Sequence, residues 1–331
     1  MSQVKINDLT LELVKNLIDN KDSYGIEIIE LKNGSTVIDC TNASKMGGKL
    51  VGEICMGGLG AVEFTSYDLD GNNLDAVDVK TSEPIISCMA SQLAGWSLKL
   101  KKEVEKEGKI KKKVVFQSLG SGPARAKAKV EKLFDEIEYS DDSDCAVIFF
   151  ETRKMPNEEV LTIVSEKCKV DARNTYAVCA PTACLTGSIQ VSARVVETGI
   201  HKLHELHFPL DVILDGSGIA PVAPIAKDDL AAMGTTNDSI IAAGITNYTI
   251  DVEKEKEAEL FEIIKTAPAN KSTSYGKPFN EIFKEANYDF YKIDSGLFAP
   301  AIYTVKNTKT GESITVGEKN HDLLKKSYGI G

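Results

Sequence analysis

Apolar positions change their spacing along the chain, and the spacing indicates where helices and strands form. At the start they recur every three or four residues, as on one face of a helix; they are Ile6, Leu9, Leu13, Val14, Leu17 and Ile18. Two pairs of shorter segments follow, 26–31 with 36–40 and 61–67 with 74–80. Asn-Gly or Asp-Gly separates each pair and accepts the positive φ angles of a tight turn. The pattern therefore predicts a helix followed by two hairpins.

From residue 84 onward, helix-like and strand-like segments alternate. The pattern predicts helices over 84–96, 123–137, 156–168 and 188–206, separated by strands over 114–116, 145–150 and 176–179. A charged helix over 252–264, a hairpin around Lys309-Thr310-Gly311 and a short terminal helix complete the chain. Such alternation favours α/β layers joined by crossover connections.

Length and composition fit a two-domain organisation. At 331 residues, with 42% hydrophobic and 27% charged residues, the chain can bury two cores of ordinary size, and general disorder is excluded. We expect an α/β (α+β) fold in which residues 1–83 and 252–331 form one domain and residues 84–251 the other. No apolar run approaches the roughly 20 residues of a membrane span, and the first residues lack the pattern of a secretory leader. We therefore expect a cytoplasmic protein with no membrane partner.

The charge balance and the cysteines narrow the range of partners. Lys and Arg total 39 against 49 Asp and Glu, and the net charge of −10 argues against nucleic-acid binding, which needs a positive face. The seven cysteines are odd in number and form no Cys-x-x-Cys pair, which is typical of reduced, buried thiols. The segment from Lys101 to Lys113 holds seven Lys and three Glu. We interpret it as a solvated hairpin tip; the alternative is an anchor for an acidic partner.

Two glycine-rich segments could approach a ligand with bare backbone. Gly120-Ser121-Gly122-Pro123 follows a strand and opens a predicted helix, where free N–H groups could bind an anion. The segment lacks the Gly-Lys-Ser/Thr of a P-loop and the third glycine of a dinucleotide fingerprint, and a tight turn with Pro at the first helical position is an equal alternative. Met56 to Gly60 contains Gly57 and Gly58 and allows the same two interpretations, a ligand contact or a sharp corner.

The segment from Ser188 to Gly199 carries the most informative pair of charges. Helical spacing places Arg194 and Glu197 on one face, three residues apart. In a cleft, a carboxylate beside a guanidinium could accept a proton from an attacking water, which is the role of a general base. On an exposed helix the same pair would be an ordinary salt bridge of little consequence.

Three histidines continue this segment at a spacing that does not suit a metal ion. His201, His204 and His207 are three residues apart, so each side chain is rotated by roughly 60° from the one before it on a straight helix. No Glu follows the His-Glu-x-x-His pattern of a zinc site. We expect no metal here, although His201 shares the face of Glu197, four residues later.

Nine short stretches along nearly the whole chain form a recognisable series. They are Ile38-Asp39-Cys40, Glu53 to Leu59, Ala94-Gly95-Trp96, Gly120 to Ala126, Ala180 to Ala183, Ser192 to Gly199, Gly234 to Asp238, Tyr275 to Phe279 and Tyr288 to Asp294. In this order they resemble the methenyltetrahydromethanopterin cyclohydrolase family. Each alone could arise by chance, but together they make the resemblance specific.

The resemblance implies a fold, an activity and a set of site residues. It implies a homotrimer whose two α/β domains face each other across a large pocket. It implies reversible hydrolysis of 5,10-methenyltetrahydromethanopterin to the 5-formyl derivative in the one-carbon metabolism of methanogens, without an external cofactor. Glu197 would orient and deprotonate water, and Arg194 would hold the carboxylate. The implied substrate-binding residues are Gly57, Gly58, Trp96, Gly120, Ser121, Gly122, Ser192, Thr198, Tyr275 and Phe279.

One departure from the family pattern leaves alternatives open. Other members carry Lys where this chain has Leu93, just before Ala-Gly-Trp. Lys99 or Lys277 could substitute, or the chain could be a non-catalytic pterin-binding homologue. A nucleotide-dependent transferase that uses the Gly120 segment as a phosphate cradle is a further alternative, and it would require Mg²⁺.

Overall fold

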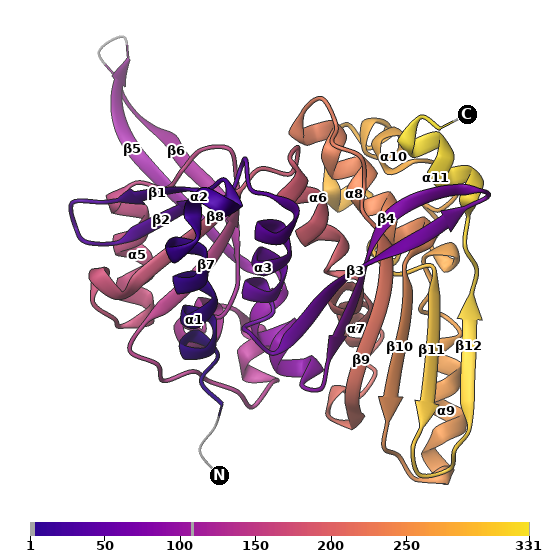
Figure 1. Cartoon of the computed structure of the whole chain (residues 1–331). Coiled ribbons are helices and arrows are strands. Elements are labelled where there is room, and N and C mark those ends of the chain that lie inside the picture. The colour runs from indigo at the N-terminus through magenta and orange to yellow at the C-terminus, as the bar shows by residue number, and fades with distance from the viewer. Residues whose placement is uncertain (1–3, 107–108, 331) are drawn as a thin grey trace.

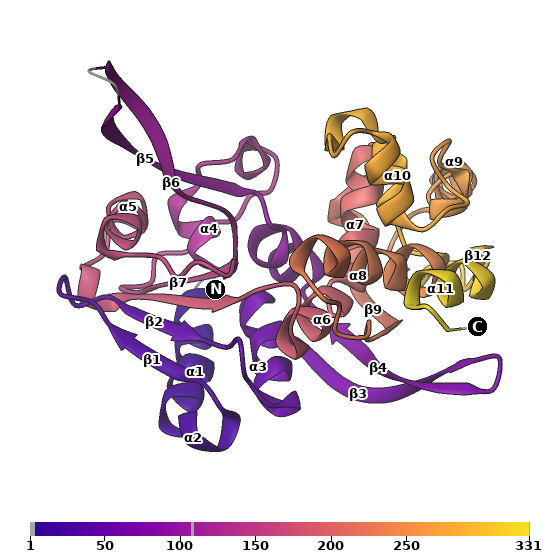
Figure 2. The same cartoon turned by 90° about the horizontal axis from the view of Figure 1, so that it is seen from above.

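The computed structural model describes residues 4–106 and 109–330, and these form two six-stranded mixed sheets that lie side by side (Figures 1 and 2). The first sheet has the strand order β1-β2-β8-β7-β6-β5 and the second the order β12-β11-β10-β9-β4-β3. The α/β fold expected from the sequence is therefore confirmed.

In the first sheet, three parallel strands form the centre and antiparallel strands form both edges. Its strands are β1 (Glu27–Glu30), β2 (Thr36–Asp39), β5 (Trp96–Lys106), β6 (Lys109–Ser121), β7 (Ala146–Glu151) and β8 (Thr175–Ala180). The β5–β6 hairpin projects from the body of the molecule (Figure 1). The Lys101 to Lys113 segment was expected to form the tip of a hairpin, and its described residues belong to these two paired strands. Residues 107–108 lie outside the described residues.

Helices cover both faces of the first sheet because its central strands are apolar on both sides. Val147, Phe149 and Val178 pack against α1 (Ile6–Asp19) and α3 (Lys45–Cys55). The alternate residues, such as Ile148 and Phe150, pack against α5 (Glu158–Cys168) on the opposite face (Figure 2). Successive residues of a strand point to opposite faces, so these continuous apolar runs are typical of a doubly covered sheet.

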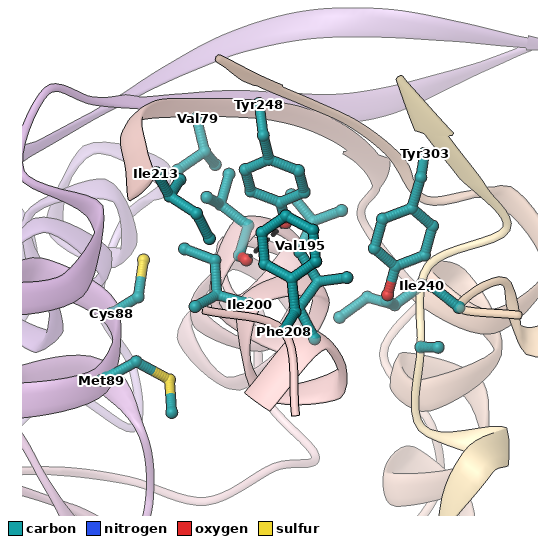
Figure 3. Close-up of a cluster of buried hydrophobic side chains, with 14 of the residues drawn as sticks. Val79, Cys88, Met89, Val195, Ile200, Phe208, Ile213, Ile240, Tyr248 and Tyr303 are labelled. Carbon is teal, nitrogen blue, oxygen red and sulfur yellow. Dashed lines mark hydrogen bonds between the residues drawn. The ribbon is translucent and has the colours of Figure 1, made fainter. Parts of the chain in front are cut away.

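In the second sheet, antiparallel pairing dominates. Its strands are β3 (Gly60–Leu69), β4 (Asn72–Thr81), β9 (Ile213–Pro221), β10 (Ile245–Ile250), β11 (Ile302–Asn307) and β12 (Ser313–Gly317). One face is buried beneath α7 (Val195–Glu205) and α9 (Lys254–Ile264). Tyr248 and Tyr303 point from this sheet toward Val195 and Ile200 of α7 (Figure 3).

The remaining helices connect and cap the two sheets. They are α2 (Lys21–Tyr24), the π-helix η1 (Ile85–Gln92), α4 (Ala124–Ala128), α6 (Leu185–Ser192), α8 (Asp229–Ala243), α10 (Phe279–Glu285) and α11 (His321–Tyr328). Short 3-10 turns are η2 (Lys132–Asp135), η3 (Ala172–Asn174), η4 (Leu210–Val212), η5 (Ala269–Lys271), η6 (Phe290–Lys292) and η7 (Ser295–Leu297). Helix α6 packs against α3 at the junction of the two halves. Within the described residues, no helix is long and apolar enough to cross a membrane.

The strands are grouped differently from the division expected at residues 83 and 251. The hairpin β3–β4 pairs with β9 of the second sheet, whereas β1 and β2 pair with β8 of the first. Strands β9 and β10 belong with β11 and β12 rather than with β7 and β8. Sheet membership depends on pairing between distant segments, which local periodicity does not report.

Four expected elements have different limits in the structure. The helix expected over 188–206 breaks into α6 and α7, and the side chain of Gln92 donates to the carbonyl of Ala193 at the break. The helix expected over 123–137 is reduced to α4 and η2, and that over 84–96 ends at Gln92 so that β5 begins at Trp96. Strand β6 extends well beyond 114–116 because it pairs with β5 along its length.

Candidate active site

A cleft of about 470 Å³ lies where the two halves meet. The first half contributes the ends of β6 and β7 and the turn after β8, and the second half contributes α6, α7, α8 and η7. The lining residues are Leu93, Ala94, Leu119, Ser121, Phe149, Glu151, Thr182, Val191, Arg194, Glu197, Thr198, His201, Glu205, Met233, Thr236, Asn237, Ser295 and Phe298. Strands β7 and β8 are parallel, so their carboxyl ends meet at one edge of the sheet, where ligands of α/β proteins commonly bind.

Glu197 is a nearly buried carboxylate in the first turn of α7, with 5% of its surface exposed. Among the described residues, none donates a hydrogen bond to it. Burial raises its pKa above the ordinary value of a glutamate, and electrostatic interactions with Arg194, His201 and Arg125 oppose that shift. The helix N-terminus also favours the ionised form. The carboxylate is thus more basic than one in water and remains within reach of the cleft.

Arg194 stands at the break between α6 and α7, where its guanidinium is held by three acceptors. Its Nε donates to Oε1 of Gln190 (3.0 Å), its Nη1 to the carbonyl of Gln92 (2.5 Å) and its Nη2 to Oγ of Ser121 (3.2 Å). Arg194 lowers the pKa of Glu197 electrostatically, as expected for two neighbouring side chains. Among the described residues, however, no hydrogen bond joins these two side chains. The arrangement is therefore not the exposed salt bridge that the sequence left open.

A second carboxylate, Glu151, enters the cleft from the last residue of β7. Its Oε1 accepts from Oγ1 of Thr182 (2.6 Å) and its Oε2 accepts from Nε2 of Gln190 (2.7 Å). Glu151 and Gln190 were not among the site residues expected from the sequence. The available signal was positional, since Glu151 directly follows a buried strand of an α/β sheet.

Several residues expected from the sequence do lie together in the cleft. They are Ser121, Arg194, Glu197 and Thr198, together with Leu93 and His201. The cleft also contains Thr182, Thr236 and Asn237, from stretches that carried the resemblance but were not assigned a role. Met233 and Phe298 add apolar surface that nothing in their local sequence distinguished from ordinary core.

The glycine segments make corners and strand contacts rather than cleft walls. Gly57 and Gly58 have positive φ angles after α3, where they pack against α1 and η1. Gly120 lies within the sheet opposite Trp96 and Phe150, and the N–H of Gly122 donates to the carbonyl of Ser91. The N–H of Gly122 is therefore engaged within the protein, and the segment makes a tight turn at this point.

Four other expected contact residues point away from the cleft. Trp96 packs in the core of the first sheet, and Oγ of Ser192 donates to the carbonyl of Pro221. Phe279 is 0% exposed and stacks on Phe283, so its ring surface is not available to a ligand. Tyr275 packs beside α8 and α11. A short sequence motif does not show whether such a residue packs inside the protein or contacts a ligand.

The lysines considered as substitutes at the Leu93 position lie elsewhere. Lys277 pairs with Glu285 (2.6 Å), and Lys99 lies in a separate groove with Trp96. Leu93 itself lines the cleft. Of the three spaced histidines, His204 pairs with Glu136 (2.6 Å) and lines a different groove together with His207, so the three do not converge.

Comparisons with known proteins identify relatives that match nearly the whole chain. A sequence model of the family described as "Cyclohydrolase (MCH)" matches residues 5–328. A methenyltetrahydromethanopterin cyclohydrolase of Methanococcus aeolicus is 44% identical, with 98% of each chain covered. The enzymes of the same name from Methanocaldococcus jannaschii and Methanosarcina barkeri are 42% and 39% identical, with 98% and 99% of each chain covered. The chain therefore belongs to the methenyltetrahydromethanopterin cyclohydrolase family.

Proposed function

We propose that this chain catalyses the reversible hydrolysis of 5,10-methenyltetrahydromethanopterin to 5-formyltetrahydromethanopterin, with Glu197 as general base. The observation that carries the role of Glu197 is its placement: a nearly buried carboxylate of raised pKa lines the cleft beside a fixed guanidinium. A base of this kind can remove a proton from water as the water attacks an electrophilic carbon.

The chemistry follows from the charge of the substrate. The reacting carbon bridges two nitrogens as a cationic amidinium, so it is already electrophilic and needs no metal or covalent nucleophile. Glu197 takes one proton from the attacking water, and the hydroxide oxygen bonds to that carbon to give a neutral tetrahedral intermediate. Arg194 stabilises the partial negative charge on the attacking oxygen, and it favours the ionised carboxylate before the proton is taken and after it is returned. Its three hydrogen bonds hold the guanidinium in place before the substrate arrives.

Ring opening completes the reaction. The bond between the carbon and the departing nitrogen breaks as the intermediate loses its hydroxyl proton and becomes the formyl group. Glu197 returns the proton it took to the departing nitrogen, and one proton per turnover is released to solvent. No electron transfer occurs, so we propose that no external cofactor is used.

The test is the loss of the methenyl chromophore in buffer free of metal and nucleotide. We expect rapid bleaching by the wild type and a rate lower by about 10²–10⁴-fold for Glu197→Gln, which keeps the shape but cannot accept the proton. Glu166→Gln, an exposed change on α5, is the matched control. Pterin binding without bleaching by the wild type would instead identify a non-catalytic homologue, with Leu93 in the cleft as the physical reason.

Assembly and location are part of the same proposal. The family resemblance supports a cytoplasmic homotrimer. Sedimentation equilibrium should give three times the 35.9 kDa mass of the chain. A single-chain mass over a wide concentration range would contradict the trimer without affecting the proposed reaction.

A further inference from the structure

The hydrogen bonds around Arg194 continue beyond the residues that the proposed reaction uses. Two of its three acceptors, the Gln92 carbonyl and Ser121 Oγ, lie on the η1 and β6 side of the cleft. The third, Oε1 of Gln190, is one turn back on α6 and is the acceptor for Nε. A planar guanidinium is oriented by acceptors that lie along more than one of its edges. The Nε contact therefore fixes the rotation of the group that the other two contacts leave open.

Gln190 can hold Nε only if its amide faces the correct way. Its side chain is fully buried, and its oxygen accepts from Arg194 while its nitrogen donates to Oε2 of Glu151 (2.7 Å). A carboxylate only accepts and a guanidinium only donates, so the two charged neighbours together permit one amide orientation. An amide turned by 180° would place donor against donor at Arg194 and acceptor against acceptor at Glu151.

Glu151 is itself fixed at its second oxygen. Oγ1 of Thr182 donates to Oε1 at 2.6 Å, and Thr182 follows the adjacent parallel strand β8. The side chains of Thr182, Glu151, Gln190 and Arg194 therefore form one continuous chain of hydrogen bonds, which begins at the rigid edge of the first sheet and in which Glu151 accepts from both neighbours. Chains of this kind hold a functional side chain in one geometry.

We propose that Glu151 and Gln190 are positioning residues that fix the Arg194 guanidinium beside Glu197 and so adjust the general base of the reaction. This inference rests on the proposed function, since it concerns the rate of that reaction. It assigns Glu151 a role through Gln190 and requires no contact between Glu151 and the substrate.

A pH profile separates this role from a purely structural one, because Arg194 lowers the pKa of Glu197 only while it is held nearby. Four other charged or titratable groups interact electrostatically with Glu197. They are Arg125 on α4, His201 on α7, Cys88 on η1 and Tyr248 on β10. None of them is altered by a change at Gln190 or Glu151.

The variants are Gln190→Leu, which breaks the chain but keeps the charge of Glu151, and Glu151→Leu, which breaks it from the other end. We expect kcat/KM at neutral pH to fall about tenfold in both, and its acidic limb to move upward by about one pH unit. Glu151→Gln should lie close to the wild type, because its amide oxygen can still accept from Gln190. Gln117→Leu, an exposed site on β6, is the matched control and should be unchanged.

The double variant Glu151→Leu/Gln190→Leu tests whether the two residues act as one chain. The double variant should be no slower than either single variant, because one substitution already breaks the hydrogen-bond chain to Arg194. Multiplying defects would overturn the inference, as would an acidic limb that stays in place while activity falls. If Gln190→Leu fails to fold, Glu151→Leu alone decides, since Glu151 is exposed whereas Gln190 is buried.

Failure of the inference and failure of the proposed function give different results. A wild type that does not bleach the methenyl chromophore contradicts the proposed function. An active wild type that requires Glu197, combined with unshifted profiles in both leucine variants, contradicts only the positioning role.

Discussion

Two opposing electrostatic effects act on the carboxyl group of Glu197. Burial favours the neutral acid, whereas Arg194, His201 and Arg125 favour the anion. Burial is the larger effect, so the pKa is raised. A general base benefits from this position, because a carboxylate with a raised pKa accepts a proton more readily than an ordinary one.

The substrate should shift this balance further, which predicts two different pH profiles. Because the base must be ionised, activity should fall with decreasing pH through the raised pKa of Glu197. A bound amidinium cation favours the carboxylate, so the acidic limb of kcat, which reports the complex, should lie at lower pH than that of kcat/KM, which reports the free enzyme. Steady-state bleaching rates across pH, corrected for the uncatalysed reaction, measure both limbs. Coincident limbs would indicate that the cation does not approach Glu197.

A second buried carboxyl, Asp238 on α8, is predicted to make stability depend on pH. Burial raises its pKa to about 7, against hydrogen bonds from Ser327 and the Phe279 N–H. The folded-state pKa is above the unfolded value, so the contribution is complete below pH 4 and is lost as the pH rises through 7. The free energy of unfolding should fall by up to about 1.4 kcal/mol per pH unit in this window.

Urea unfolding between pH 4 and 8 checks the contribution of Asp238. Asp238→Asn should flatten the slope in this range, whereas Asp19→Asn, an exposed change on α1, should keep it. An equal slope in wild type and Asp238→Asn would assign the pH dependence to other groups.

At the scale of single elements, helix α7 carries Glu197 and lies unusually close to the second sheet. Tyr248 of β10 donates its hydroxyl proton to the carbonyl of Val196 (2.8 Å), and Gly199 faces the same ring. A Cβ at Gly199 would lie 2.0 Å from that hydroxyl oxygen. The glycine therefore permits the close approach of α7, which carries Glu197, to the sheet.

Gly199→Ala should push α7 off the sheet. We expect a loss of about 1–3 kcal/mol in the free energy of unfolding, as for other overpacked sites, together with a lower kcat. Adding Tyr248→Phe should restore part of both, because the next nearest ring atom, Cζ, lies at 3.0 Å. The single Tyr248→Phe variant supplies the baseline, with a loss of about 1 kcal/mol for one hydrogen bond. No recovery in the double variant would mean that the hydroxyl is not the obstacle.

At the scale of the whole molecule, the chain passes between the sheets three times, so neither half is a continuous segment. It runs from the first sheet to β3–β4, returns to β5–β8 and then enters β9–β12. A single hydrophobic cluster also joins Cys88 and Met89 of η1 to Val195 and Ile200 of α7 (Figure 3). The cleft at this junction therefore depends on both halves being folded.

This interleaving predicts that the two halves unfold together. Trp96 is the only tryptophan and lies in the core of the first sheet, so its fluorescence reports that half, whereas far-UV circular dichroism reports both. The two denaturation curves should coincide, as in a two-state transition. An earlier transition by fluorescence would show that the first half unfolds independently.

By itself, the sequence determined most local elements. Periodic apolar positions predicted the first helix, the hairpins and the α/β class, because burial of one face imposes periods of 3.6 and 2. The local spacing of Arg194 and Glu197 predicted that the two residues lie near each other, but it left an ordinary salt bridge open, and the family resemblance implied their roles.

Only the tertiary structure decided the sheet in which β3–β4 pairs, the helix break at Arg194 and the chain from Glu151 through Gln190. It also separated the residues that line the cleft from those, such as Phe279, that are buried in the core. These features are contacts between residues far apart in the sequence. Such contacts leave no local period, so they emerge only when the two sheets pack together.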